Sequence, residues 1–333
     1  MKETRNCSVD IFRYIAAILI IALHTTAFLD ISPIVSYLFS QILPRISAPF
    51  FFVIAGYYYS KKLENGSGNL LKYLKRLLIP YCVWSIGYYL AFLLQYHTIS
   101  LKSILPDFLF RGPAYHFWFF PSLIYSVILF TALYRINLHH ISIPFSLILY
   151  LFGCMCSAYY GIFQSNSLIN AIAESGHFQW IINFLFCGPS FFICGYLIYK
   201  ISAFWSSLSN NGILLLLSCA FILYLVEIFT LKSSNIAKNI TITVGLYILV
   251  TALVIFLLRH PLPNQCHLAS YCSTLANYTY YSHVLFIILF TQLNTSIFQN
   301  FLTETPLFLL VLISTVVTGS LLRKIPIVNT LLL

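Results

Sequence analysis

The feature that most constrains this chain is a series of long apolar runs that fills most of its 333 residues. We predict ten runs of 17 to 26 residues, at 11–29, 34–59, 77–96, 118–134, 143–160, 180–199, 211–230, 240–258, 272–292 and 305–322. About 20 apolar residues in a helix cross a bilayer, with every backbone hydrogen bond satisfied internally. Only 8% of residues are charged, against about 25% in soluble domains. The sequence predicts an all-α polytopic integral membrane protein with about ten transmembrane helices.

The placement of Lys and Arg predicts how these helices are oriented. An even number of spans puts both termini on one side, and twelve of the eighteen cations lie in connections on that side. Four lie on the opposite side, which by the positive-inside rule makes both termini cytoplasmic. The net charge of +10 then reflects topology and contact with anionic membrane lipid, not nucleic-acid binding. The short connections predict a single transmembrane domain over residues 1–333, and the nine scattered Cys predict no metal site.

Two ionisable residues lie on one face of the first predicted helix. Arg13 and His24 are eleven residues apart, which is close to three helical turns and about 16 Å along the axis. Ionisable groups inside a span usually face a polar cavity, because burying them in lipid is costly. We interpret His24 as a general base or nucleophile facing an anionic ligand, although a structural histidine bonded to a backbone carbonyl is the simpler alternative.

Arg45 is a second cation inside a span, and Pro44 and Pro49 flank it. We expect the helix to kink or unwind there, which is tolerated where the segment faces protein or a cavity. Arg45 either pairs with a carboxylate or binds a phosphate or carboxylate of a ligand. The acids near or within spans are Asp10 and Glu227, and the excess of positive charge favours an anionic ligand.

Further polar residues lie beside aromatic ones. Tyr115, His116 and Trp118 open the fourth span, where Tyr and Trp are usually interfacial anchors. His283 lies in the ninth span, where helix packing and a polar-cavity role are equally consistent with the pattern. Lys72 and Arg76 belong to a short amphipathic segment before the third span. They either contact lipid headgroups or bind the phosphates of a nucleotide-like donor.

Six segments in this order resemble the bacterial membrane acyltransferase-3 family. They are DIFRYIAAILIIALH at 10–24, RISAPFFFVIAGYYY at 45–59, YLKRLLIPY at 73–81, YHFWFF at 115–120, FFICGYLI at 191–198 and YTYYSHVLF at 278–286. The resemblance implies an enzyme of the bacterial cytoplasmic membrane that moves an acyl group, usually acetyl, from cytoplasmic acyl-CoA. Its acceptor would be a hydroxyl of a cell-surface glycan or lipid-linked precursor. Some members form the membrane half of serine racemases, which are implicated in serine supply.

The resemblance also implies roles for particular residues. His24, Arg13 and His116 would be catalytic, and four cations would bind acetyl-CoA as a co-substrate with no tightly bound cofactor: Arg13, Arg45, Lys72 and Arg76. The substrate-binding residues would be Tyr115, Trp118, Glu227 and His283. Two routes stay open, because His24 either deprotonates the acceptor or carries the acyl group itself. A transporter or flippase for an amino acid or a lipid-linked sugar remains the alternative function, and a homo-oligomer remains an open alternative to a monomer.

Overall fold

The computed structural model describes residues 6–96, 101–262, 266–297 and 301–325, and every regular element within them is helical. Seven helical segments there are long and apolar enough to cross a membrane. They are Cys7–His24, Pro33–Glu64, Leu70–Gln95, His139–Cys156, Phe178–Lys200, Asn210–Ser234 and Glu304–Leu322. The described chain is therefore that of an all-helical membrane protein, in which seven spans meet the length and hydropathy requirements.

The predicted count of about ten spans is not confirmed, and the three remaining runs show why. Two of them form shorter apolar helices, α6 (Phe119–Arg135) and α14 (Val244–Arg259). The third lies inside α15 (Cys266–Ser296), which is long enough to cross a bilayer. Its first half, however, is rich in Ser, Thr, Asn and Tyr, so its mean hydropathy is reduced. Such polar content is expected of a helix that faces protein and not lipid.

The chain divides into two compact units, each of which is described here by itself. Unit 1 comprises 1–48, 78–100 and 260–333, and unit 2 comprises 49–77 and 101–259. The elements of unit 1 are α1 (Cys7–His24), α2 (Pro33–Ser36), a π-helix η1 (Tyr37–Ile42), a 3₁₀-helix η2 (Leu43–Ile46), most of α4 (Leu70–Tyr96), α15 and α16 (Glu304–Leu322).

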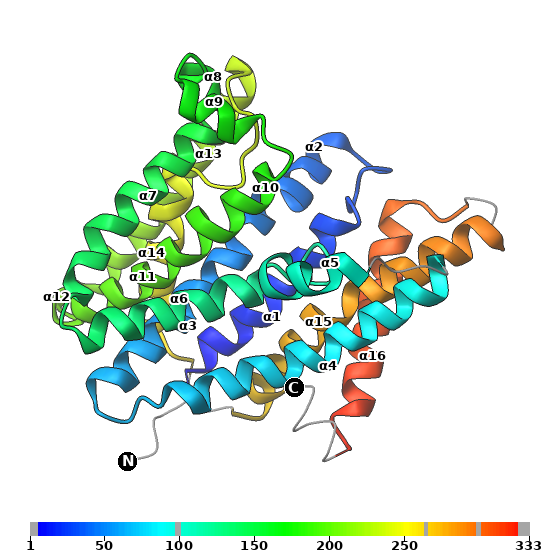
Figure 1. The fold of residues 1–333 in the computed structure, drawn as a ribbon, viewed down its shortest axis with the longest axis horizontal. Coiled ribbons are helices and arrows are strands. Elements are labelled where there is room, and N and C mark those ends of the chain that lie inside the picture. Colours follow the sequence, from blue (N-terminus) through cyan, green and yellow to red (C-terminus); the bar gives the residue numbers. More distant parts are fainter. Residues whose placement is uncertain (1–5, 97–100, 263–265, 298–300, 326–333) are drawn as a thin grey trace. The chain divides into compact units, whose positions relative to one another are not determined.

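Unit 1 is built on the packing of its first helix against its last two. α1 packs along α15, and α15 packs along α16 (blue, orange and red in Figure 1). A buried apolar cluster joins these elements and consists of Ile21, Ala22, Ala27, Phe308 and Val311. The C-terminal end of α1 is therefore anchored in the core of this unit.

The proline-flanked segment around Arg45 departs from α-helical geometry, as predicted. η1 and η2 precede α3 (Ser47–Glu64), and Pro44 lies in the first turn of η2. Proline has no N–H to donate and clashes with the preceding turn, so a local change of helical pitch accommodates it. The predicted unwinding at this position is confirmed.

Unit 2 contains the rest of α3 and the first turns of α4, followed by α5 to α14. The elements not yet given are α5 (Leu101–Pro106), η3 (Asp107–Arg111), η4 (His139–Ile141), α7 (Ser142–Cys156), α8 (Tyr160–Phe163), α9 (Ser167–Ala173), α10 (Phe178–Ile181), η5 (Ile182–Cys187), α11 (Gly188–Lys200), α12 (Ser202–Ser207) and α13 (Asn210–Ser234).

In the interior of unit 2, α3 and α11 approach so closely that glycine is required. A Cβ on Gly56 would lie 2.0 Å from the Phe192 carbonyl oxygen, and one on Gly195 would lie 2.1 Å from that of Val53. These contacts explain the glycines of two quoted segments, FVIAGYYY and FFICGYLI.

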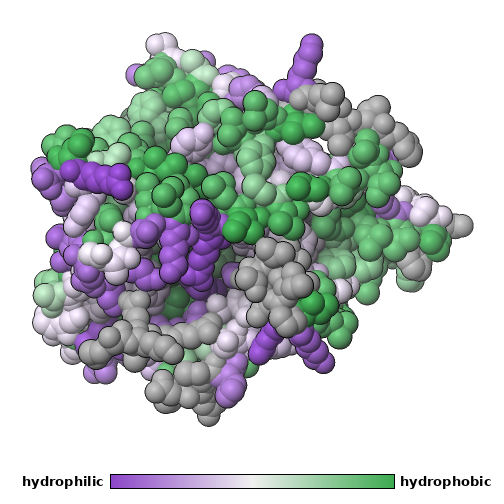
Figure 2. Space-filling model, turned by 60° about the horizontal axis from the view of Figure 1, so that its bottom comes forward, coloured by the Kyte–Doolittle hydropathy of each residue, from purple (hydrophilic) through white to green (hydrophobic). Residues whose placement is uncertain are grey.

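The surface is strongly apolar, as a lipid-facing protein requires. Green hydrophobic residues cover much of the face drawn in Figure 2, interrupted by purple hydrophilic groups. Several long helices present large apolar side chains outward, including Leu94 of α4 (78% exposed) and Leu215 of α13 (65% exposed). Extended apolar exposure of this kind marks contact with a membrane or a partner.

Candidate functional site

Helix α1 carries both Arg13 and His24, which confirms that one helix presents the two residues. Near its start, Arg13 Nη1 donates to Asp10 Oδ1 at 3.4 Å and forms an ion pair with it. The local acid named from the sequence therefore partners the nearest cation. The helix ends at His24 and does not continue to residue 29 as predicted. His24 thus occupies the last helical position, where the backbone is about to turn.

The His24 ring stacks on the ring of His283, which belongs to α15. Their centroids are 5.5 Å apart and their planes differ by 18°. His283 is fully buried, and its Nδ1 lies 2.9 Å from the carbonyl oxygens of both Thr279 and Tyr280. Because a carbonyl accepts only, we assign the His283 proton to Nδ1, which leaves the lone pair on Nε2. The structure therefore brings together two imidazoles that are 259 positions apart in the sequence.

Arg45 belongs to the same unit and lies on η2. Its Nη2 donates to Oε1 of Gln41, one turn earlier, at 3.3 Å. Its positive charge also acts on the ring of His24 and on the hydroxyl of Tyr37. Arg13, His24, Arg45 and His283 are all parts of unit 1. The structure thus brings His24, His283 and Arg45 together, whereas Arg13 lies about three turns away near the start of α1, paired with Asp10.

The turn after His24 has a rare backbone conformation. Thr26 and Phe28 both have left-handed φ angles, of 48° and 68°. The Ala27 N–H donates to the Ala22 carbonyl at 3.1 Å, which is the closing bond of a Schellman motif at a helix C-terminus. Glycine or asparagine normally occupies the position held by Thr26, and a β-branched residue there is a conformational outlier. Each such residue costs about 1–3 kcal/mol, which the surroundings must offset.

Several hydrogen bonds hold this left-handed turn in place. Buried Ser40 Oγ donates to the Ala27 carbonyl at 2.9 Å, and the Phe28 N–H donates to Thr305 Oγ1 at 3.1 Å. The Asp30 carboxylate accepts from the hydroxyl of Thr303 at 2.6 Å, from the Thr305 hydroxyl, and from the Thr305 N–H at 3.3 Å. These donors hold the pKa of Asp30 below its ordinary value. The first turn of α16 is therefore tied to the residues that follow His24.

Nothing in the sequence marks this turn. HTTAFLD contains no glycine or proline after the histidine, so the apolar run predicts that the helix continues. Asp30, Ser40 and Thr305 are ordinary polar residues outside any motif. Only the positive φ angles and the long-range hydrogen bonds reveal their connection to His24.

In unit 2, Tyr115, His116 and Trp118 form the loop that leads into α6. His116 is 3% exposed and meets the Phe117 ring edge-on at 4.4 Å, whereas Tyr115 is 58% exposed. The Trp118 ring stacks on Phe52 of α3 at 5.8 Å. Gly112 has a φ of 82°, and a Cβ there would lie 2.4 Å from the Phe117 side chain. This glycine therefore shapes the loop that presents His116 inward and Tyr115 outward.

Glu227 of α13 has a definite structural position. Its Oε1 accepts from the Val244 N–H at 3.0 Å, its Oε2 accepts from the Gly245 N–H at 2.7 Å, and Tyr159 donates its hydroxyl to Oε1. Carboxylates stabilise helix N-termini because they accept from the free N–H groups and oppose the helix dipole. Glu227 thus caps α14, and its predicted role in substrate binding stays a prediction.

Lys72 and Arg76 lie at the start of α4. The expected short amphipathic helix is not separate, because one continuous helix runs from Leu70 to Tyr96 with Pro80 inside it. Asn69 caps this helix by accepting the Lys72 N–H at 2.9 Å. Both cations are exposed. Such groups are available to either of the predicted partners, lipid headgroups or donor phosphates.

These features define an all-helical membrane protein in which a partly buried histidine stacks on a fully buried one, in a unit that also holds two arginines. The chain belongs to the acyltransferase-3 family, whose model, described as an acyltransferase domain, matches residues 6–324. The family resemblance noted from the sequence is confirmed. Membership of this family supports the activity of a membrane acyltransferase.

Among similar proteins, an amino-acid racemase of Enterococcus faecalis is 32% identical over 274 residues, which cover 78% of this chain and 38% of that protein. A second amino-acid racemase of E. faecalis is 30% identical over 203 residues, or 58% of this chain and 28% of the relative. A serine/alanine racemase of Enterococcus gallinarum is 28% identical over 272 residues, or 77% and 38%. The chain thus spans less than two fifths of the length of these relatives. No solved structure matches it.

Proposed function

We propose that this protein is a membrane O-acyltransferase that uses acetyl-CoA or a related acyl-CoA on the cytoplasmic side. The acceptor would be a hydroxyl of a cell-surface glycan or a lipid-linked precursor. The observation that carries the proposal is the stack of His24 on His283, in the unit that also holds Arg13 and Arg45. Family membership supports acyl transfer, and the imidazole pair supports general-base or nucleophilic chemistry.

In the direct route, His24 removes the proton of the acceptor hydroxyl as its oxygen attacks the thioester carbonyl. The carbon–sulfur bond then breaks, and the CoA thiolate leaves and takes up the proton. In the relay route, an imidazole nitrogen of His24 attacks the thioester carbonyl first, the carbon–sulfur bond breaks, and the CoA thiolate leaves with the imidazole proton. The acceptor hydroxyl then attacks the carbonyl of the acyl-imidazole, the carbon–nitrogen bond breaks, and the hydroxyl proton returns His24 to its neutral form. Both routes require His24 to be unprotonated when it acts, and a second neutral imidazole stacked on it is compatible with that state.

The charged and aromatic residues have proposed roles in binding. Arg13 and Arg45 would contact the anionic part of the donor, because guanidinium groups bind phosphates in a bidentate manner. Lys72 and Arg76 are proposed as further contacts for CoA phosphates, and His116 as a second acid–base residue. Tyr115, Trp118, Glu227 and His283 are proposed as acceptor contacts. For His283 the lone pair on Nε2 would accept a hydrogen bond from the acceptor hydroxyl.

The test is acyl transfer, or slow hydrolysis of acetyl-CoA, by purified full-length protein in lipid nanodiscs. We expect His24→Ala to reduce the rate by about 10²–10⁴-fold, the usual contribution of a general base. Its melting temperature should stay close to that of the wild type, because His24 is only partly buried at a helix end. Full activity in His24→Ala would overturn the assignment of His24.

The names of the relatives favour a second function, transport of a small amino acid. Three relatives are racemases of amino acids, one of them of serine and alanine. A membrane protein that supplies such a substrate would move it without acyl-CoA. Uptake of labelled serine or alanine into proteoliposomes that contain no acyl-CoA would favour this function. Absence of uptake together with acetyl transfer would favour the enzyme.

A further inference from the structure

We propose that Thr305 and Asp30 are positioning residues for His24, an inference that rests on the proposed function. They hold the left-handed turn Thr26–Phe28 closed, and this turn keeps the end of α1 in the register that stacks His24 on His283. The proposal assigns a role in catalysis to the first turn of α16, which contributes no group to the imidazole pair.

The first step of the argument is the location of the strained turn. His24 is the last residue of α1, so its backbone is supported by the helix on one side and by the turn on the other. Thr26 and Phe28 adopt φ angles that L-residues with large side chains disfavour. Strain of this kind persists only where the surroundings determine the conformation. Without its ties, the turn would relax and the last turn of the helix would fray.

The second step is that the ties converge on the strained residues themselves. Thr305 Oγ1 accepts the N–H of Phe28, and its hydroxyl donates to Asp30. Asp30 in turn accepts from the Thr303 hydroxyl and the Thr305 N–H at the start of α16. Both ends of the segment Phe28–Asp30 are therefore fastened to the same helical turn. A carboxylate with this many donors makes strong, directional bonds.

The third step is the packing that transmits the position of the turn. Ala27 is fully buried in the cluster with Ile21, Ala22, Phe308 and Val311. The Phe28 ring contacts Phe308 at 5.8 Å and Phe39 at 5.6 Å. Phe308 follows Thr305 by one turn of α16, so the hydrogen bonds and the apolar contacts fix the same register. α15 packs along both α1 and α16 and carries His283.

The experiment compares a matched set of variants in full-length protein in nanodiscs. Thr305→Ala removes both hydroxyl bonds, Thr305→Ser retains them, and Thr318→Ala is the control. Thr318 lies on the same helix, and its hydroxyl donates to the Ser314 carbonyl within that helix. The first readout is the rate at which diethyl pyrocarbonate modifies His24, measured by peptide mass spectrometry. This rate reports ring environment and does not depend on acyl transfer.

We expect Thr305→Ala to change the rate of His24 modification, with Thr305→Ser and Thr318→Ala at the wild-type rate. We also expect kcat for acetyl transfer to fall about tenfold or more at an unchanged KM for acetyl-CoA, because a small misplacement of a catalytic group mainly affects the chemical step. Wild-type modification of His24 in Thr305→Ala, with or without a lower melting temperature, would overturn the proposal. If the wild type transfers no acyl group but His24 modification responds as expected, the positioning role stands and the enzymatic function fails.

A double variant sharpens the test and covers the case in which Thr305→Ala fails to fold. Glycine adopts left-handed φ angles at no steric cost, so Thr26→Gly should lessen the need for the tie. In the Thr26→Gly background we expect Thr305→Ala to change the rate of His24 modification less than it does alone. If Thr305→Ala alone does not fold, we expect the double variant to fold and His24 to be modified at the wild-type rate. An equal, additive effect in both backgrounds would show that the turn does not mediate the coupling.

Discussion

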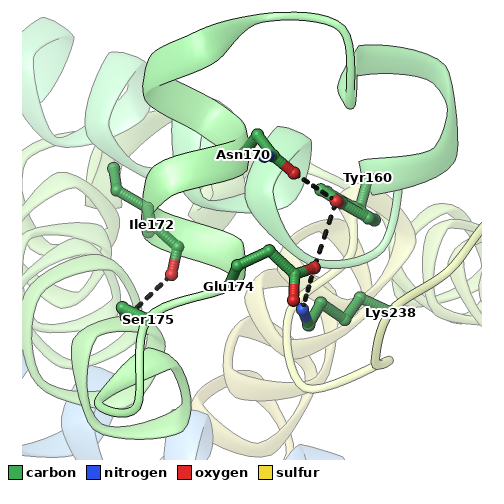
Figure 3. A network of polar contacts seen from close by, with 6 residues as sticks. All are labelled: Tyr160, Asn170, Ile172, Glu174, Ser175 and Lys238. Atoms are coloured by element: carbon green, nitrogen blue, oxygen red, sulfur yellow. Dashed lines mark hydrogen bonds and ion pairs between the residues drawn. The ribbon is translucent and has the colours of Figure 1, made fainter.

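Two polar regions of this protein, one in each unit, both contain a cation paired with a carboxylate but differ in what surrounds the pair. In unit 2, Lys238 donates to Glu174 at 2.7 Å, and the Tyr160 hydroxyl lies 2.6 Å from Asn170 Oδ1 and 3.2 Å from Glu174 Oε1 (Figure 3). Lys238 also lies 5.2 Å from the centre of the Tyr160 ring. Charge is balanced within this network, and each member is held by the others.

The region around His24 in unit 1 is arranged differently. Its charged groups include two arginines, Asp10 bonded to one of them, and Asp30 in the turn after His24, and its two imidazoles stack face to face. A backbone turn with two left-handed residues supports it. Strain and perturbing charge gather where a protein performs chemistry, whereas balanced networks serve structure. The comparison therefore supports the proposal that the chemistry takes place in unit 1, with a structural role for the network around Glu174.

The variants with the largest expected effect test whether His283 contributes to catalysis through the stacking of its ring or through its Nε2 nitrogen. His283→Phe retains an aromatic ring beside His24 but removes the lone pair, and His283→Gln retains polarity but removes the ring. If Nε2 accepts the hydrogen bond from the acceptor hydroxyl, both variants should lose about 10²-fold or more in kcat. Retained activity in His283→Phe alone would reduce the role of His283 to packing. Steady-state kinetics of acetyl transfer provide the measurement.

The next effect concerns the charge of the His24 region. Arg45→Gln removes a cation beside an imidazole, and we expect the KM for acetyl-CoA to rise about tenfold, which corresponds to roughly 1.4 kcal/mol of binding. The matched control is Lys238→Met in unit 2, where a cation of the Glu174 network is removed. It should leave KM unchanged, since that network is proposed to be structural. Equal effects of the two variants would remove the distinction between the regions.

A smaller effect is expected at Glu227, which caps α14. Glu227→Ala leaves the Val244 and Gly245 N–H groups without their acceptors. Loss of such a cap typically costs about 1 kcal/mol, so the melting temperature should fall while the KM for acetyl-CoA stays the same. Glu227→Gln, which retains one acceptor oxygen, should be intermediate. An unchanged melting temperature together with lost acceptor binding would instead support the predicted role in substrate binding.

The smallest effect is a pH dependence in the Glu174 network. Its hydrogen bonds to Lys238 and Tyr160 lower the pKa of Glu174. Because the folded pKa lies below the unfolded one, the stabilisation is complete above the ordinary value of about 4.3 and is lost as pH falls through the lowered value. Wild type should therefore melt slightly above Glu174→Gln at neutral pH, and the difference should vanish on acidification. A difference that grows in acid would contradict the cited bonds.

Much of the helical framework and two site features could be predicted from the chain. Arg13 and His24 share one helix because an eleven-residue spacing is close to three turns, and this relation is local. The unwinding around Arg45 follows from proline, whose effect on a helix is also local. The count of ten spans is not confirmed, because α6 and α14 are shorter than the seven segments that meet the length and hydropathy requirements, and the polar residues of α15 lower its mean hydropathy.

The sequence by itself determined that this is a helical membrane protein of the acyltransferase-3 family, because hydropathy, helical periodicity and motif order are properties of contiguous residues. Only the tertiary structure decided that His283 is the partner of His24, that Glu227 caps α14, and that Thr305 and Asp30 clamp the turn after α1. Each of these contacts joins residues on different elements, from 18 to 277 positions apart for the bonds cited here. Such contacts depend on how helices pack, and packing energy comes from many weak contacts that no local pattern records.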